Sequence, residues 1–427
     1  MARRTTKLLS VAALAALALS GCSGSSSADN ASSSGKPVTL TFWGTYGNGG
    51  NSTQTDALNK TIIPAFEKAN PGIKIKYVDM PYDSLLQKLT TSAAAGELPD
   101  LVRSDIGWVP KFAALKVYAQ LDGSMPGFDK LAADNYPGSL ATNKWDGHYY
   151  GLPLDTNTRV QISNPATLKK AGLTAPPSTF EELQADAPKL AAKKISVFAD
   201  GGLQGWNVYP WIWSAGGSVT NDDLTKATGY LNSPQSVAGV QMLLDLYKQG
   251  AIPNLIIGNK GAVQTSDGLP KGNYATILDG PWMTGVWSGQ YPDFKPTYAP
   301  VPAGPGGSVS VVGGEDINMT TASKHQKEAM KFLAFTQSAD FQLAMAKTGQ
   351  MSVVKSLGDQ EASQNPDLAP FITQLATARP RPSVPQAPAI DTALQDELTK
   401  AFQGKQTVQQ ALDNAAKTID GLLTQTS

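Results

Sequence analysis

The chain has 427 residues, with 35 basic and 35 acidic side chains, two histidines and one cysteine. This balance leaves no basic excess for a nucleic-acid backbone, and one cysteine excludes an intrachain disulfide or a multi-cysteine zinc site. The two histidines, His148 and His325, are far apart and belong to no metal-binding motif. We therefore expect neither a nucleic-acid partner nor a metal or other cofactor.

The first segment predicts export. Three basic residues precede the apolar run 8–20, which is too short to cross a bilayer as a helix, so residues 1–21 are predicted to be a signal peptide. Its removal leaves 32 basic and 35 acidic residues, a net charge of −3. The segment ends in Leu19-Ser20-Gly21-Cys22, which resembles the bacterial lipobox, in which the cysteine becomes the lipid-bearing first residue.

Residues 22–36 are therefore expected to be a lipidated cysteine and a tether. Two or more acyl chains on Cys22 would hold the protein stably on a membrane. The stretch 23–36, SGSSSADNASSSGK, is a low-complexity segment with a reach of about 20 Å. The expected location is the extracytoplasmic face of the bacterial cell membrane.

Strand and helix patterns then alternate. Residues 38–42 alternate apolar and polar side chains as a strand does, and a Gly-rich loop follows at 44–50. A helix is predicted at 53–70 with a kink at Pro64, a strand from Ile73, a helix at 83–95 and a strand at 100–103. This order predicts a mostly parallel sheet covered by helices on both faces.

Ligands of such sheets bind beyond the carboxyl ends of the strands, which selects the loops 43–51 and 104–108. The first loop contains Tyr46 and Asn48 as candidate ligand contacts. Residues 47–52 read GxGxxS, without the acidic partner of a dinucleotide site, so a plain loop that lets a ligand approach the backbone is the better interpretation.

Helix signals recur in the second half. Ser178 to Glu181 has the pattern of a capping box, Ser233-Pro234 opens a helix that runs to Gly250, and Thr407 with Gln410 caps a last helix. Two Pro/Gly-rich stretches, 300–307 and 379–388, suit interdomain loops. About 390 residues exceed one typical core and predict two domains.

Aromatic residues and carboxylates gather near predicted strand ends. In GNYATILDGPWMTGVW (272–287) a short buried strand is followed by a Gly-Pro turn and Trp282, which is either a lid on the core or a wall for a ligand. The aromatic residues expected in or beside such loops are Trp43, Trp108, Trp206, Tyr209, Trp211 and Trp282. The carboxylates are Asp105, Asp155 and Glu315.

A sugar needs flat aromatic walls for its C–H face and paired hydrogen-bonding groups for its hydroxyls, and the chain offers both. The same carboxylates leave a glycoside hydrolase open, because that chemistry needs only two of them across a cleft. Each of them alone is equally compatible with a helix cap or a surface charge.

From about Val38 to Leu423 the chain resembles the extracellular sugar-binding proteins of ABC importers, the group that includes maltose-binding protein. The motifs that carry the resemblance, in order, are Phe66-Glu-Lys-Ala-Asn-Pro-Gly72, Leu98-Pro-Asp-Leu-Val102, Tyr150-Gly-Leu-Pro-Leu-Asp155, Gly272 to Trp282, Val301 to Gly307 with Gly313-Gly314, and Gly404 to Ile419. Each motif is short, and their order and spacing make the resemblance specific.

The resemblance implies a two-lobed α/β fold of the periplasmic-binding-protein type II, with three interlobe crossings and the sugar between the lobes. The first lobe would hold residues 37–153 and 316–368, and the second lobe 156–312 and 373–427. The implied function is that of a monomeric receptor, not an enzyme, which captures an oligosaccharide and delivers it to the permease. A surface-anchored glycoside hydrolase and a receptor for a non-sugar solute are the alternatives.

The resemblance also assigns site residues. Trp282 matches an aromatic that stacks on the sugar, and Trp206 a second such wall. The further implied contacts are Asp105, Trp108, Glu315, Arg379 and Arg381. One departure is Ser163-Asn164, where the family has Tyr-Asn, and it leaves the contacts near Asp155 and Asn157 open.

Overall fold

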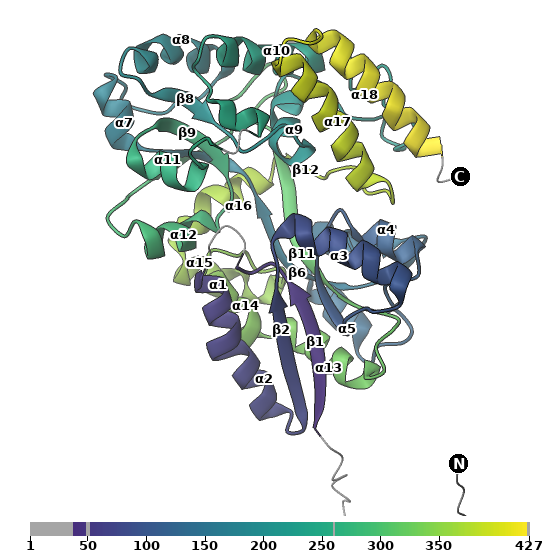
Figure 1. Cartoon of the computed structure of the whole chain (residues 1–427). Helices are drawn as coiled ribbons and strands as arrows, with labels where there is room; N and C mark the ends of the chain where they lie inside the picture. The colour runs from purple at the N-terminus through teal and green to yellow at the C-terminus, as the bar shows by residue number, and fades with distance from the viewer. Residues whose placement is uncertain (1–36, 48–51, 259–260, 425–427) are drawn as a thin grey trace, which may run out of the picture. The chain divides into compact units, whose positions relative to one another are not determined.

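The computed structural model describes residues 37–47, 52–258 and 261–424 (Figure 1). The predictions for the signal peptide, Cys22, the tether and Asn48 lie outside these residues. No helix within the described ranges is long and apolar enough to cross a membrane.

The first lobe is built on a six-stranded sheet. Its order is β12-β11-β3-β1-β2, and β6 also pairs with β11. The strands β1, β2 and β3 are mutually parallel, as expected, whereas β11 runs antiparallel to both β3 and β6. The bounds are β1 (Val38–Gly44), β2 (Ile73–Asp79), β3 (Leu101–Asp105), β6 (Leu152–Thr158), β11 (Ser310–Met319) and β12 (Ala378–Arg379).

Helices cover both faces of this sheet, so β1 buries side chains on both of its faces. Leu40 and Phe42 point into one cluster, with side chains of α2, α13 and α14, whereas Trp43 points into another, with α3 and α4. Figure 1 shows α2 and α3 on opposite sides of β1 and β2. The helices that follow the strands of this lobe, with the short hairpin β4 (Lys144–Trp145) and β5 (His148–Tyr149), are α1 (Ser52–Ala57), α2 (Ile63–Ala69), α3 (Tyr82–Ala95), α4 (Val109–Ala114), α5 (Phe128–Asp134), α6 (Pro137–Ala141), α13 (Gln326–Thr336) and α14 (Ala339–Ala346).

The second lobe has a four-stranded sheet in the order β10-β7-β9-β8. Only β8 and β9 are parallel, and β7 is antiparallel to both β9 and β10. The expectation of a mostly parallel sheet is therefore wrong in this detail, since the sheet is mixed. The bounds are β7 (Val160–Ser163), β8 (Ser196–Ala199), β9 (Tyr274–Asp279) and β10 (Thr297–Ala299).

Two apolar clusters pack the helices of the second lobe against its sheet, and the smaller of the two holds α11 and α12. The helices are α7 (Pro165–Lys170), α8 (Phe180–Ala191), α9 (Gly205–Ser214), α10 (Pro234–Lys248), α11 (Thr265–Lys271), α12 (Met283–Gln290), α17 (Ala387–Phe402) and α18 (Val408–Leu423). Short 3₁₀ turns occur at Asn254–Ile257, Lys355–Leu357 and Pro366–Leu368.

The chain passes between the sheets at Arg159, which alone separates β6 from β7. Further along, α15 (Gly358–Gln364) and α16 (Ala369–Leu375) follow the helices of the first lobe, and Leu368 and Phe371 pack in the same cluster as Ile162 and Ile277 of the second sheet. The expected lobe boundaries stay a prediction.

Local signals predicted two helix starts correctly. Ser233 and Thr407 cap α10 and α18 through their side chains, and the capping box of Thr407 and Gln410 is complete. The box predicted at Ser178 is wrong by one residue: the cap is Thr179, and the Glu182 carboxylate accepts from the Ser178 backbone. The helix expected over 53–70 is interrupted by a π-helix at Leu58–Ile62, just before Pro64.

Candidate functional site

A cavity of about 1010 Å³ is lined from both lobes. The first lobe contributes side chains from β3, from the start of α3 and from β11. The second lobe contributes the start of α9, the turn between β9 and α12, and α17 with the loop before it. The strand ends selected by the sequence therefore converge on one space, as expected for ligands of such sheets.

Two tryptophans form an aromatic wall of this cavity. Trp206 is near the start of α9 and Trp282 immediately precedes α12, and their ring centroids lie 6.1 Å apart with planes inclined by 33°. Both are partly buried and line the cavity. A Cβ on Gly280 would overlap the Trp282 ring, so glycine lets the indole fold back over the turn after β9.

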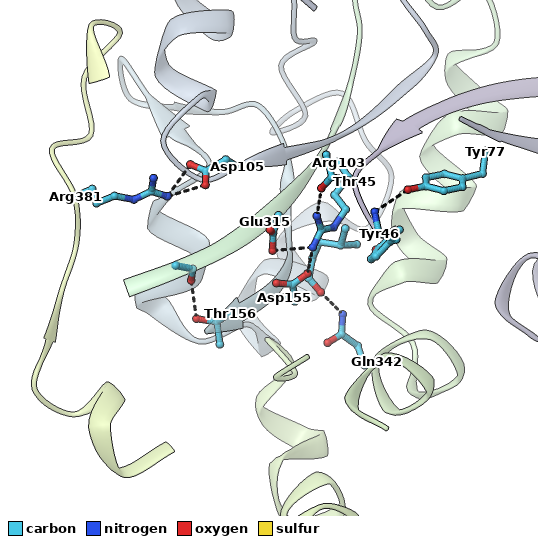
Figure 2. Close-up of polar contacts among 12 residues, drawn as sticks. Thr45, Tyr46, Tyr77, Arg103, Asp105, Asp155, Thr156, Glu315, Gln342 and Arg381 are labelled. Carbon is cyan, nitrogen blue, oxygen red and sulfur yellow. Dashed lines mark hydrogen bonds and ion pairs between the residues drawn. The ribbon is translucent and has the colours of Figure 1, made fainter. Parts of the chain in front are cut away.

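Two of the predicted site residues, Asp105 and Arg381, form an ion pair in the cavity lining. Arg381 Nη2 donates to both carboxylate oxygens of Asp105, at 2.6 and 2.8 Å (Figure 2). Asp105 ends β3, whereas Arg381 lies in the loop between β12 and α17, and each side chain is 11% exposed. The guanidinium also lies 5.7 Å from the Trp206 ring centroid. Arg381 thus joins a carboxylate of the first lobe to the aromatic wall of the second.

A second arginine, Arg103, lies beside the first pair. Its Nη2 is 2.9 Å from Glu315 Oε2 and 3.5 Å from Asp155 Oδ2, and its Nη1 donates to Thr45 Oγ1 at 2.5 Å (Figure 2). Glu315 lies opposite Asp105 on β3 and opposite Asp155 on β6. Two guanidinium groups, those of Arg103 and Arg381, therefore pair with three carboxylates on adjacent strands. These carboxylates belong to Asp105, Asp155 and Glu315.

This crowding of carboxylates affects protonation. Burial raises the pKa of Glu315 well above its ordinary value; Arg103 opposes the rise and the carboxylate of Asp155 adds to it. Burial also raises the pKa of Asp391, which lines the cavity from α17, while Arg381 opposes this.

A third ion pair supports the aromatic wall from behind. Arg159 Nη2 donates to both oxygens of Asp200 at 2.9 Å, and both side chains are almost fully buried. Arg159 also donates to the backbone carbonyls of Trp206, at 3.1 Å, and of Leu278. The guanidinium therefore fixes the backbone that carries Trp206 and the strand that leads to Trp282.

Asp279, the last residue of β9, lines the cavity next to this support. Its carboxylate accepts from the Gly280 backbone at 2.8 Å. Burial raises its pKa to about 6; the nearby Arg159 opposes this shift, and Asp200 adds to it. Within the described ranges Asp279 forms no ion pair.

The structure brings six of the predicted site residues onto the cavity lining: Trp282, Trp206, Asp105, Trp108, Glu315 and Arg381. Trp108 is only 3% exposed, because most of its ring packs in the first lobe's core and against Tyr82. Asp155 and Tyr46 lie behind the lining, where the Tyr46 ring is 4.4 Å from the Arg103 guanidinium. Arg379 is exposed on β12 and does not line the cavity.

The expectation that all six aromatic residues lie in or beside loops is wrong for the residues of α9. Trp206, Tyr209 and Trp211 are in that helix, and Trp211 is 1% exposed and packs against Phe180 and Phe198. Trp43 lies within β1 and belongs to the core. Trp206 and Trp211 are five residues apart on α9 and therefore point to different sides of the helix. This spacing explains why Trp206 lines the cavity whereas Trp211 packs in the core.

Sequence reasoning missed several lining residues. Arg103, Asp279, Gln204 and Gln350 were not predicted. A charged residue that directly follows the apolar pair Leu101-Val102 in a short predicted strand was an available signal for Arg103, because a buried cation requires partners. The segments that carry Gln204 and Gln350 show no comparable signal.

The sequence profile of the bacterial extracellular solute-binding proteins matches residues 49–343. The chain belongs to this family. A binding protein of Brucella abortus is 29% identical over 87% of the chain and 91% of its own length. The galactooligosaccharide-binding protein of Bacillus subtilis is 26% identical, covering 85% and 86%, and an sn-glycerol-3-phosphate-binding periplasmic protein of Yersinia pseudotuberculosis is 27% identical, covering 85% and 88%.

Among solved structures, the GacH receptor of Streptomyces glaucescens, studied with acarbose, aligns with a TM-score of 0.81 at 22% identity over 90% of this chain and 98% of its own. This likeness confirms the expected two-lobed fold of the maltose-binding-protein type. Membership of a family of binding proteins confirms the expectation of a receptor over an enzyme.

Proposed function

We propose that this protein captures an oligosaccharide between its lobes and delivers it to the permease of an ABC importer, while a lipid on Cys22 holds it at the extracytoplasmic face of the membrane. The observation that carries the proposal is the pair Trp206 and Trp282 on one wall of a cavity whose other walls carry carboxylates, amides and guanidiniums. Such a site matches the apolar face and the hydroxyl rim of a sugar.

The proposed roles follow from position. Trp282 and Trp206 stack on sugar rings, and Asp105, Glu315 and Arg381 bind hydroxyls. The buried side-chain oxygens of Asn157 and Gln350 line the cavity without a hydrogen-bond partner in the described part of the chain. Such orphaned acceptors are costly unless a ligand or water satisfies them, which supports their contact with the bound sugar.

The relatives give two candidate ligand classes. The galactooligosaccharide-binding protein and the acarbose receptor favour an oligosaccharide, and the cavity volume of about 1010 Å³ has room for more than one ring. The glycerol-phosphate-binding relative makes a small phosphorylated solute the second candidate ligand. The aromatic pair favours the sugar, because glycerol phosphate offers no ring to stack.

Tryptophan fluorescence tests the proposal directly. Maltose, trehalose and cello-, xylo-, manno- and galacto-oligosaccharides should be titrated, and calorimetry should measure the affinity of each sugar that changes the emission. We expect micromolar or tighter binding of at least one sugar, recovered intact. Shortened products would instead support the glycoside hydrolase. If no sugar changes the fluorescence and glycerol 3-phosphate does, the ligand is a phosphorylated solute and not a sugar.

A further inference from the structure

The lining of the cavity is unequal in charge. Its described residues include two guanidiniums, Arg103 and Arg381, and no lysine. The same lining carries five carboxylates: Asp83, Asp105, Asp279, Glu315 and Asp391. The chain as a whole is balanced, with 35 residues of each sign, so this acidic excess is a local property of the cavity.

Both guanidinium charges are already neutralised. Arg381 holds Asp105 with two hydrogen bonds, and Arg103 lies between Glu315 and the buried Asp155. Each Nε–H is buried and lacks an acceptor within the described ranges. An acidic ligand group finds no unneutralised cation there and must compete with a protein carboxylate for either arginine.

The carboxylates of the second lobe are compensated less directly, by the nearby guanidiniums of Arg159 for Asp279 and of Arg381 for Asp391. Asp279 accepts from the Gly280 backbone, and Asp391 from the Tyr209 hydroxyl at 3.4 Å, but neither forms an ion pair with any described residue. Burial raises the pKa of both carboxyl groups, and the nearby arginines oppose this rise without cancelling it. A cation brought by the ligand would stabilise both ionised groups.

The aromatic wall accepts cations as well. Trp282 is three residues after Asp279, and its partner Trp206 has two guanidiniums, of Arg159 and Arg381, each 5.7 Å from its ring centroid. Arg381 itself shows how the cavity holds a cation, between a carboxylate and an indole. A protonated amine on a sugar would meet the same two kinds of group at Asp279 and Trp282.

We propose that the cavity selects its sugar by charge: it prefers an oligosaccharide with a protonated amine, placed at Asp279 beside the tryptophan pair, over the neutral sugar, and it rejects uronic acids and sugar phosphates. This inference rests on the proposed function and narrows its substrate class. Asp279 is then the residue that determines specificity.

The test compares matched sugars by calorimetry. The β-linked probes are cellotriose, the corresponding glucosamine trisaccharide and its N-acetylated, uncharged form; the α-linked probes are maltotetraose and acarbose, which contains a basic amine. The acidic probes are a trigalacturonic acid and glycerol 3-phosphate. We expect the amine-bearing member of a bound pair to bind about tenfold more tightly than its neutral partner, and the acids not to bind.

Salt and variants separate charge from shape. The tenfold preference should shrink between about 20 mM and about 0.5 M salt, a test that needs no substitution. Asp279→Asn should remove the preference for the amine-bearing sugar, while Asp146→Asn, on an exposed hairpin turn outside the cavity, should leave both that preference and the affinity for the neutral sugar unchanged.

Equal binding of amine and neutral partners, binding of an acidic probe, or a preference that survives Asp279→Asn would each overturn the inference and leave the sugar receptor standing. If no sugar binds, either in this comparison or in the fluorescence titrations that test the proposed function, the proposed function is overturned and the inference with it.

Discussion

Two tryptophans five residues apart, Trp282 and Trp287, provide a matched pair of substitutions to alanine. Trp282 is partly buried and faces the cavity beside Trp206. Trp287 is 2% exposed, donates its indole N–H to the Ser266 carbonyl at 2.8 Å, and meets the edge of Phe294. The first side chain is therefore placed for a ligand and the second for the core.

The expected magnitudes differ accordingly. Trp287→Ala leaves a cavity and an orphaned carbonyl in the core, which should lower the free energy of unfolding by about 3 to 5 kcal/mol. Trp282→Ala removes part of a wall already open to solvent, so its effect on stability should be clearly smaller. Its loss of sugar affinity should reach about 2 kcal/mol, or about thirtyfold, as for an aromatic anchor in an interface.

The two effects are measured separately, by urea unfolding without ligand and by calorimetric titration with the sugar that binds best in the fluorescence panel. Trp287→Ala should shift the urea midpoint strongly while folded protein keeps most of its affinity. Unchanged affinity of Trp282→Ala together with a large fall in its urea midpoint would refute the stacking role and return Trp282 to the core.

Four further outcomes are expected. Gly280→Ala should weaken sugar binding severalfold, measured by titration, because the added methyl overlaps the Trp282 ring and displaces it; unchanged affinity would show that the indole position is unimportant. Arg159→Gln should lower the unfolding free energy by about 3 to 5 kcal/mol in urea, because Asp200 is left buried without its cation; a loss below about 1 kcal/mol would contradict this. The folded pKa of Asp279, about 6, lies above the unfolded value of about 3.9, so its stabilising contribution is fully present below about pH 4 and is lost as the pH rises through 6. Relative to the wild type, Asp279→Asn should gain stability between pH 4 and pH 7 in urea unfolding, and a difference independent of pH would refute the shift. Cys22→Ser should release the protein from the membrane in fractionation, because only a thiol forms the thioether, and a variant that stays membrane-bound would end the lipobox interpretation.

Elements with strong local signals were predictable from the sequence. The caps at Ser233 and Thr407 place a hydroxyl where the first backbone amides of the helix need an acceptor, and this depends on neighbouring residues only. The position of Trp282 after β9 follows from the strand pattern and the Gly-Pro turn. In each case the chemistry that decides the structure lies within one turn of the chain.

The charged centre of the site was not predictable in this way. Arg379 and Arg381 are two residues apart in the same Pro-rich stretch, yet the first is exposed on β12 and the second binds Asp105. Which of the two reaches the cavity depends on how the loop leaves β12, and β12 is positioned by its pairing with β11, a long-range contact without a local pattern. Arg159 likewise acquires its role only when Asp200 and the carbonyl of Leu278 are brought beside it from other segments.

The ion pair of Arg381 and Asp105 also limits how the lobes can move. Asp105 is fixed in β3 of the first sheet, whereas Arg381 precedes α17, whose Ile390 and Leu394 pack in the apolar cluster of the second lobe. A hinge motion that opens the cavity must separate these two groups or draw the loop along with it. A ligand shifts the lobes only by the affinity it gains in one arrangement over the other. A sugar whose hydroxyls replace this ion pair must therefore offset the free energy lost with the pair before the sugar stabilises the closed arrangement. A sugar that hydrogen-bonds to the intact ion pair instead gains from the preorganised geometry of the pair.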